Sequence, residues 1–214
     1  ELMEVREVAI KHDLLVMADE VYEFNIYDDN KHISIASLAD MKERTITISA
    51  FTKGYAMDGW RVGYAAGPKS IISEMLKVTL NETTHPCVFA QEGAVAAVLG
   101  SQDCVKEMVD DDCLRRDLLV DRLNKMPGVK CATPQATIYG FADFSAWGIS
   151  SDELSKNILE NTHVAIESGA FYGEAGEGHL RICFGSESYE RLEEAMNRIE
   201  NYLNSLSLPE VASN

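Results

Sequence analysis

Side chains capable of acid–base or covalent chemistry directly follow two short apolar runs. Asp19-Glu20-Val21-Tyr22 comes after the run 14–18, and Thr52-Lys53 comes after the β-branched run 44–51. Both runs predict strands, and parallel strands of open α/β sheets present ligand-binding groups at their carboxyl ends. A lysine amine is a nucleophile and a base once it is deprotonated. On position alone, a lysine after a strand is more often a solvated charge, so the neighbouring motifs must decide.

The negative net charge argues against binding to a large polyanion, but not against binding to a small anionic ligand. Lysine and arginine total 19 against 35 aspartate and glutamate residues, which gives a net charge of −16. Such a chain repels nucleic acid and anionic membrane on average, so neither is expected as a partner. A small anionic substrate still needs local positive charge, and Arg61 and Arg181 are candidates to provide it.

Cysteine and histidine spacing argues against disulfide and metal sites. The five cysteines include no CxxC pair, and the five histidines are scattered without ligand spacing. We therefore expect a reduced, cytoplasmic setting and no metal. No apolar run approaches the ~20 residues of a membrane-spanning helix. Residues 1–10 resemble the middle of an amphipathic helix, so the chain is expected to begin inside an element.

The remaining pattern predicts an α/β half followed by a small α+β unit. The strand at 14–18 is expected to be buried on both faces. Ser150 and Glu153 form a capping box. A single apolar stripe from Leu192 to Leu203 predicts the last helix. The other expected elements are strands at 59–68, 129–132, 138–144 and 181–184, helices at 70–80, 89–99, 104–126 and 152–162, and a frayed tail at 209–214.

Three motifs, taken together, resemble one enzyme family. Asp19-Glu20-Val21-Tyr22, then Thr52-Lys53 eight residues before Arg61, and later Gly176 to Arg181 are similar to the signature of fold-type I pyridoxal-phosphate-dependent aminotransferases of class I/II. Residues 55–64 are closest to the branch with aspartate and kynurenine aminotransferases. The resemblance covers essentially the whole chain and implies that it is the C-terminal half of such an enzyme.

The resemblance also implies a fold, a domain division and an assembly. The fold class is α/β, with part of the large pyridoxal-phosphate-binding domain, a mainly parallel sheet with helices, before a small α+β C-terminal domain. The large-domain part is expected at 1–100, a connecting long helix at 101–126 and the small domain at 127–214. Relatives complete each active site across a two-fold axis, so a homodimer is implied.

The resemblance assigns roles to six residues. Lys53 would hold pyridoxal 5′-phosphate as a Schiff base and move the substrate's Cα proton. Asp19 would keep the cofactor's ring nitrogen protonated, and Tyr22 would hydrogen-bond its 3′ oxygen. Thr52 and Arg61 would bind the phosphate, and Arg181 would clamp the substrate carboxylate. The substrates implied are an L-amino acid and a 2-oxo acid.

Departures from the family pattern leave other functions open. Ala50, Ser168 and Ala136 stand where many relatives have serine, proline and glycine, respectively. A β-eliminating carbon–sulfur lyase would use the same lysine and aspartate, and a non-catalytic module could share the fold. Without a first half, the large-domain strands are expected to expose apolar faces and edges. The isolated chain is therefore expected to bind cofactor weakly and to turn over little.

Overall fold

The computed structural model describes residues 1–206 and divides the chain into two compact units. Unit 1 runs from Glu1 to Val109, and unit 2 begins at Asp110. The division lies inside helix α4 (Asp103–Lys125), within the segment 101–126 expected to connect two domains. The three-part domain assignment stays a prediction. The expected tail at 209–214 lies outside the described residues, and within 1–206 no helix is long and apolar enough to cross a membrane.

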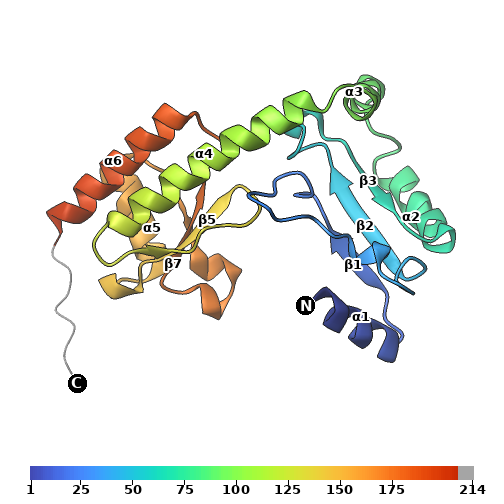
Figure 1. Ribbon diagram of the computed structural model, residues 1–214, viewed down its shortest axis with the longest axis horizontal. Coiled ribbons are helices and arrows are strands. Elements are labelled where there is room, and N and C mark those ends of the chain that lie inside the picture. Colours follow the sequence, from blue (N-terminus) through green and yellow to red (C-terminus); the bar gives the residue numbers. More distant parts are fainter. Residues whose placement is uncertain (207–214) are drawn as a thin grey trace. The chain divides into compact units, whose positions relative to one another are not determined.

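Unit 1 is built on a three-stranded sheet with the order β1-β2-β3 (Figure 1). Strands β1 and β2 are parallel, whereas β3 is antiparallel to β2, because a connection of turns and one 3-10 helix returns the chain directly beside β2. The elements of unit 1 are α1 (Leu2–Lys11), β1 (Val16–Asp19), η1 (Ile35–Ser37), β2 (Thr45–Ala50), η2 (Asp58–Trp60), β3 (Gly63–Ala66), α2 (Lys69–Glu82) and α3 (Val88–Leu99).

The strand expected at 59–68 is shorter than predicted. Residues 58–60 form η2, and Arg61 has φ 53° and ψ 46°, in the left-handed region. A residue in that conformation cannot continue an extended strand, so β3 begins only at Gly63.

The expectation that the first strand is buried on both faces is wrong for this chain. Met17 on β1 keeps 66% of its surface exposed and Leu15 just before it keeps 62%. All four residues of β3 are also exposed. Within residues 1–206, no element covers these positions. The apolar run alone could not predict this. The expectation that the chain by itself exposes apolar strand faces is confirmed.

Unit 2 contains a four-stranded sheet with the order β4-β5-β7-β6 and only antiparallel pairs. Ser150 Oγ accepts a hydrogen bond from the backbone N–H of Glu153, so Ser150 caps the start of α5 as expected. The elements that follow α4 are β4 (Lys130–Cys131), β5 (Tyr139–Asp143), η3 (Ser145–Trp147), α5 (Ser151–Thr162), β6 (Glu167–Ser168), η4 (Gly169–Tyr172), η5 (Glu174–Gly176), β7 (His179–Cys183) and α6 (Tyr189–Ser205).

One face of this second sheet is buried under helices. Ala142 and Leu180 are fully buried on neighbouring strands, and a Cβ on Gly140 would meet the Leu119 side chain of α4. Arg122 of α4 bonds Glu200 of α6 at 2.5 Å, which ties the two helices together. Because side chains alternate along a strand, Phe141 and Arg181 lie on the opposite face of the sheet. These two residues are direct partners on β5 and β7.

Candidate functional site

The turn after β1 presents the first group of predicted site residues. The Asp19 carboxylate accepts a hydrogen bond from the backbone N–H of Val21 at 3.2 Å, which closes a short Asx-type turn and leads the chain to Tyr22. Glu20 lies between them, and its carboxylate accepts from Ser34 Oγ at 2.8 Å and lies 3.0 Å from His32 Nε2. These contacts hold the loop before η1 against the turn that contains Asp19.

Lys53 lies in the turn after β2, at the same end of the sheet. Asp19 pairs with Ile48 in parallel register, so the carboxyl ends of β1 and β2 meet at one edge. The Lys53 Nζ lies 5.5 Å from the centre of the Tyr22 ring, within the range of a cation–π contact. The structure therefore brings the predicted lysine and the predicted phenol together, with the predicted aspartate at the end of the adjacent strand.

The backbone of the lysine turn is closely held. Met57 N–H donates to the Phe51 carbonyl at 3.1 Å and Ala56 N–H donates to the Lys53 carbonyl at 3.0 Å. A Cβ on Gly54 would lie only 2.4 Å from the Phe24 ring, so only glycine allows this approach.

Helix α3 packs against the same turn. Phe51, Met57 and Val62 form a buried cluster with Ala94 of α3. Next to it, a Cβ on Gly93 would lie 2.6 Å from the Trp60 ring. Small residues on α3 therefore let the turn that contains Lys53 pack closely on the helix.

Thr52 and Arg61 lie at the edge where β2 and β3 begin to separate. Phe51 N–H donates to the Val62 carbonyl at 3.3 Å, which places Thr52 and Arg61 just beyond this bonded pair. Thr52 is half-buried and Arg61 is exposed, with its Nη1 donating to the Asp58 carbonyl at 2.8 Å. The guanidinium thus folds onto its own turn.

Sequence reasoning missed a polar network next to these residues. The Glu23 carboxylate accepts from Ser49 Oγ at 3.1 Å and from Tyr64 Oη at 3.3 Å, joining the β1 turn to both other strands. Burial and then the Glu23 charge raise the pKa of Tyr55, whose hydroxyl donates to Gln102 at 2.9 Å. Glu23 follows Tyr22 directly, so its place beside the motif was the only available signal.

Arg181 belongs to unit 2 and has its own surroundings. It lies on β7, forms an ion pair with Glu167 of β6, and its guanidinium carbon lies 4.2 Å from the Tyr139 ring centre and 5.0 Å from that of Tyr172. Sequence reasoning singled out the arginine but neither the glutamate nor the two tyrosines.

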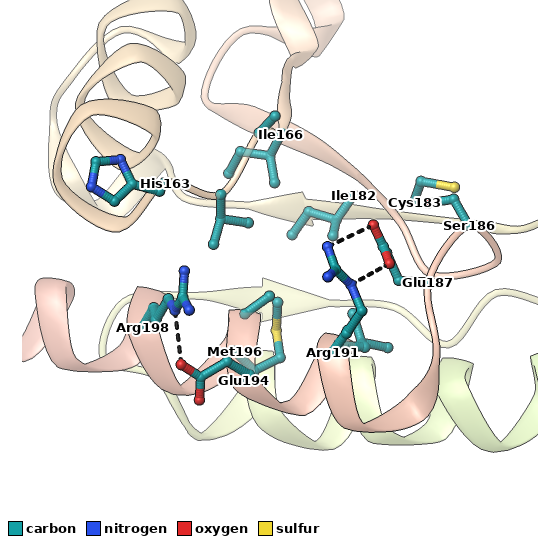
Figure 2. A pocket seen from close by; sticks show the side chains of 14 residues that line it. His163, Ile166, Ile182, Cys183, Ser186, Glu187, Arg191, Glu194, Met196 and Arg198 are labelled. Carbon is teal, nitrogen blue, oxygen red and sulfur yellow. Dashed lines mark hydrogen bonds and ion pairs between the residues drawn. The ribbon is translucent and has the colours of Figure 1, made fainter.

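A separate cavity of about 580 Å³ opens in unit 2 between α6 and the segment after α5 (Figure 2). None of the predicted site residues lines it. Its arginines are engaged by carboxylates one turn earlier on α6 or just before it, at 2.5 Å for Arg191 with Glu187 and 2.8 Å for Arg198 with Glu194. These ion pairs neutralise both arginines, so neither is available to bind an anion in the cavity.

Comparisons with known proteins agree with the motifs. The family described as "Aminotransferase class I and II" matches residues 1–199. The chain is 43% identical over 205 residues to an aspartate aminotransferase of Pyrococcus abyssi and 40% identical to an aromatic-amino-acid aminotransferase of Thermococcus litoralis. Each match covers 95% of this chain and 52% of the relative. The chain thus spans about half the length of the curated relatives it matches.

A solved structure gives the same result. The aromatic aminotransferase of Pyrococcus horikoshii matches with a TM-score of 0.91 and 41% identity, over 95% of this chain and 54% of that chain. The predicted α/β fold class is confirmed. From its matched residues, its fold and its identity to these relatives, the chain belongs to the class I and II aminotransferase family.

Proposed function

We propose that this chain is part of a pyridoxal-phosphate-dependent aminotransferase that moves an amino group between an L-amino acid and a 2-oxo acid, with Lys53 as the cofactor-binding lysine. The observation that supports this most directly is the Lys53 amine 5.5 Å from the Tyr22 ring, at the sheet edge where β1 ends in Asp19. The order of the motifs along the chain supports its being the second half of the enzyme.

The side chains of unit 1 fit such a cofactor chemically. An amine, a carboxylate and a phenol lie in the turns after β1 and β2, and a hydroxyl and a guanidinium lie where β2 and β3 separate. When bound, pyridoxal 5′-phosphate supplies an aldehyde for the amino group and a ring that withdraws electrons. Thr52 and Arg61 are the donors for its phosphate. For Arg61 this role requires the side chain to leave the Asp58 carbonyl.

Each remaining residue has one task in this proposal. Asp19 holds a proton on the ring nitrogen, because a carboxylate stabilises a nearby cation. Tyr22 donates a hydrogen bond to the 3′ oxygen. Lys53 takes the proton from the substrate Cα and returns it during transfer. Arg181 binds the substrate α-carboxylate and fixes the direction of the Cα–H bond.

The resemblance supports two further parts of the proposal. A homodimer is the expected assembly of the whole enzyme, and the cytoplasm is the expected location. We infer both from the family and from the cysteine pattern, and size measurement of the whole enzyme in solution tests the first.

Borohydride trapping tests the role of Lys53. A version of the enzyme that includes a first half like that of the relatives is incubated with pyridoxal 5′-phosphate, reduced and digested, and the modified peptide is identified by mass spectrometry. We expect the adduct on Lys53, its loss in Lys53→Arg, and its retention in Lys69→Arg, which alters an exposed lysine of α2. Equal labelling of surface lysines, or no adduct on position 53, would contradict the proposal.

Turnover separates the aminotransferase from the alternatives. A version of the enzyme that includes a first half like that of the relatives is assayed with amino donors and 2-oxoglutarate. Amino-acid-dependent glutamate formation supports amino transfer. Pyruvate and ammonia without an acceptor would point to the lyase, and no turnover with a trapped Lys53 adduct would limit the proposal to cofactor binding.

A further inference from the structure

We propose that Glu167 is an internal competitor for the carboxylate-binding side of Arg181, so that a substrate carboxylate binds only by displacing it. The inference rests on the proposed function in one respect, the assignment of Arg181 as the substrate clamp. It adds a residue outside all three motifs, one that sets how tightly the substrate binds.

The strand register brings the two charges together. Glu167 of β6 is the direct antiparallel partner of Arg181 on β7, so both side chains stand on the same face of the sheet. The ion pair joins Glu167 Oε2 to Arg181 Nη2. Tyr172 Oη donates to the same Oε2 at 2.6 Å, which holds the carboxylate against the arginine.

The nitrogen that Glu167 engages is the one a bidentate ligand needs. Guanidinium can bind a carboxylate end-on through Nη1 and Nη2 or side-on through Nε and Nη2, and Nη2 is common to both forks. Glu167 therefore obstructs both geometries with one contact.

The aromatic neighbours restrict approach from elsewhere. The guanidinium carbon of Arg181 lies 4.2 Å from the centre of the Tyr139 ring and 5.0 Å from that of Tyr172, whose hydroxyl also bonds Glu167. Phe141 stacks on His179 and contacts Tyr172 edge-on, which extends this aromatic surface. Ring faces cover guanidinium faces, so an incoming carboxylate must approach in the plane of the fork, where Glu167 already lies.

Charge and exposure favour displacement over permanent pairing. With Glu167 bound, Arg181 offers no net positive charge in a protein of net charge −16. The Arg181 side chain is 27% exposed and that of Glu167 47%, so water can solvate the carboxylate when it leaves. If Glu167 instead only positioned Arg181, removing its charge would weaken ligand binding, which is the opposite sign.

Direct binding of propionate to the 214-residue chain tests this without cofactor. The signal is the Nε–Hε NMR resonance of Arg181, assigned by its loss in Arg181→Gln. Glu167→Gln removes the competing charge, and Tyr172→Phe removes the hydroxyl that holds it. Glu174→Gln removes an exposed charge from η5 and is the matched control.

We expect the dissociation constant for propionate to fall roughly three- to fivefold in Glu167→Gln, the size of a partly exposed ion pair, and to fall less in Tyr172→Phe. The control is expected to stay unchanged. An unchanged or weaker affinity in Glu167→Gln, or an equal gain in the control, would overturn the proposal.

Failure of the clamp itself gives a different result. If propionate shifts the Arg181 resonance in none of the variants, the role of Arg181 in the proposed function fails along with this inference. If propionate binds Arg181 equally well with and without Glu167, only the competition by Glu167 is overturned. The Lys53 trapping experiment is independent of both outcomes.

Discussion

At the scale of single residues, Glu167 and Arg181 have opposite effects on the ionisation of Tyr172. The hydrogen bond from Tyr172 to Glu167 raises the pKa of the phenol, because a phenolate would lose the bond and face a carboxylate. Arg181 acts in the opposite direction, since a cation stabilises the phenolate. The titration of Tyr172 therefore reports directly on the Glu167 contact.

We predict that Glu167→Gln lowers the pKa of Tyr172. A pKa that is higher in the folded than in the unfolded chain gives stability that is complete below the unfolded pKa of ~10 and is lost as the pH rises through the folded pKa. Tyrosinate absorbance at 295 nm against pH, corrected with Tyr172→Phe, measures the shift. An identical titration with and without Glu167 would refute the contact.

A second residue-scale prediction concerns the thiols. Burial raises the pKa of Cys131, so its thiolate is scarce at neutral pH, whereas Cys87 and Cys104 are exposed. Brief iodoacetamide treatment of the folded chain at pH 8, followed by peptide mass mapping, is expected to label the exposed pair well before Cys131. Comparable rates in the folded chain, with urea-unfolded chain as the control, would contradict the burial of this thiol.

Residue types and spacing could single out Lys53, Asp19 and Tyr22 as candidates, because a motif is local. They could not predict that Ser49 donates to Glu23, or that Glu167 pairs with Arg181. The pairing of Glu167 with Arg181 depends on strand register, which is fixed by the whole sheet rather than by any short segment. The bond between Ser49 and Glu23 depends on how the turn after β1 folds back towards β2.

At the scale of elements, α4 and β5 of unit 2 approach each other closely at Gly140. Gly140 has no room for a side chain, because a Cβ there would lie 2.8 Å from Leu119 Cδ2, and Leu119 is fully buried. The helix and the strand are thus complementary, because β5 has no side chain at position 140 and the large Leu119 side chain of α4 fills that space.

We predict that Gly140→Ala destabilises unit 2 by about 1–3 kcal/mol, the usual cost of overpacking a closed core. Leu119→Val in the same chain should restore part of the loss. Gly59→Ala, where a Cβ would meet nothing within 4 Å, is the control and should change stability by less than about 0.5 kcal/mol. Urea unfolding followed by circular dichroism measures all three, and an equal loss in both glycine variants would exclude the packing explanation.

Element prediction succeeded where the signal is local. The cap at Ser150 and the apolar stripe of α6 each depend on neighbours within a turn or two of one helix, and both elements form as expected. The two-residue strand β6 was not predicted, because only its pairing with β7 defines it. Strand β3 was overestimated because the left-handed turn at Arg61 leaves no mark in residue type.

At the scale of the whole molecule, the two units differ in how much core each has. Among the described residues, ten of the twelve largest fully buried side chains belong to unit 2, and only Tyr27 and Met41 belong to unit 1. In unit 1, Phe89 and Leu99 of α3 keep 72% and 81% of their surface exposed. Local stability follows buried apolar contact, so unit 1 is expected to open more readily.

Hydrogen exchange followed by mass spectrometry tests this difference. Peptides from α2 and α3 are expected to exchange well before peptides from β7 and α6, and a dye that binds exposed apolar surface should bind the native chain. Uniform protection across both units, with no dye binding, would show that unit 1 is as stable as unit 2 on its own.

The close packing of the turn that contains Lys53 has a consequence for how the lysine side chain moves. Gly54 packs directly against the Phe24 ring, and the carbonyls of Phe51 and Lys53 both accept hydrogen bonds from backbone N–H groups. The Cα of the lysine is therefore a fixed pivot, and the reach of its amine comes only from rotation about the four methylene carbons. Such rotations take picoseconds to nanoseconds, whereas loops move in nanoseconds to microseconds. The Lys53 nitrogen can therefore change its contacts within picoseconds to nanoseconds without any movement of the backbone turn.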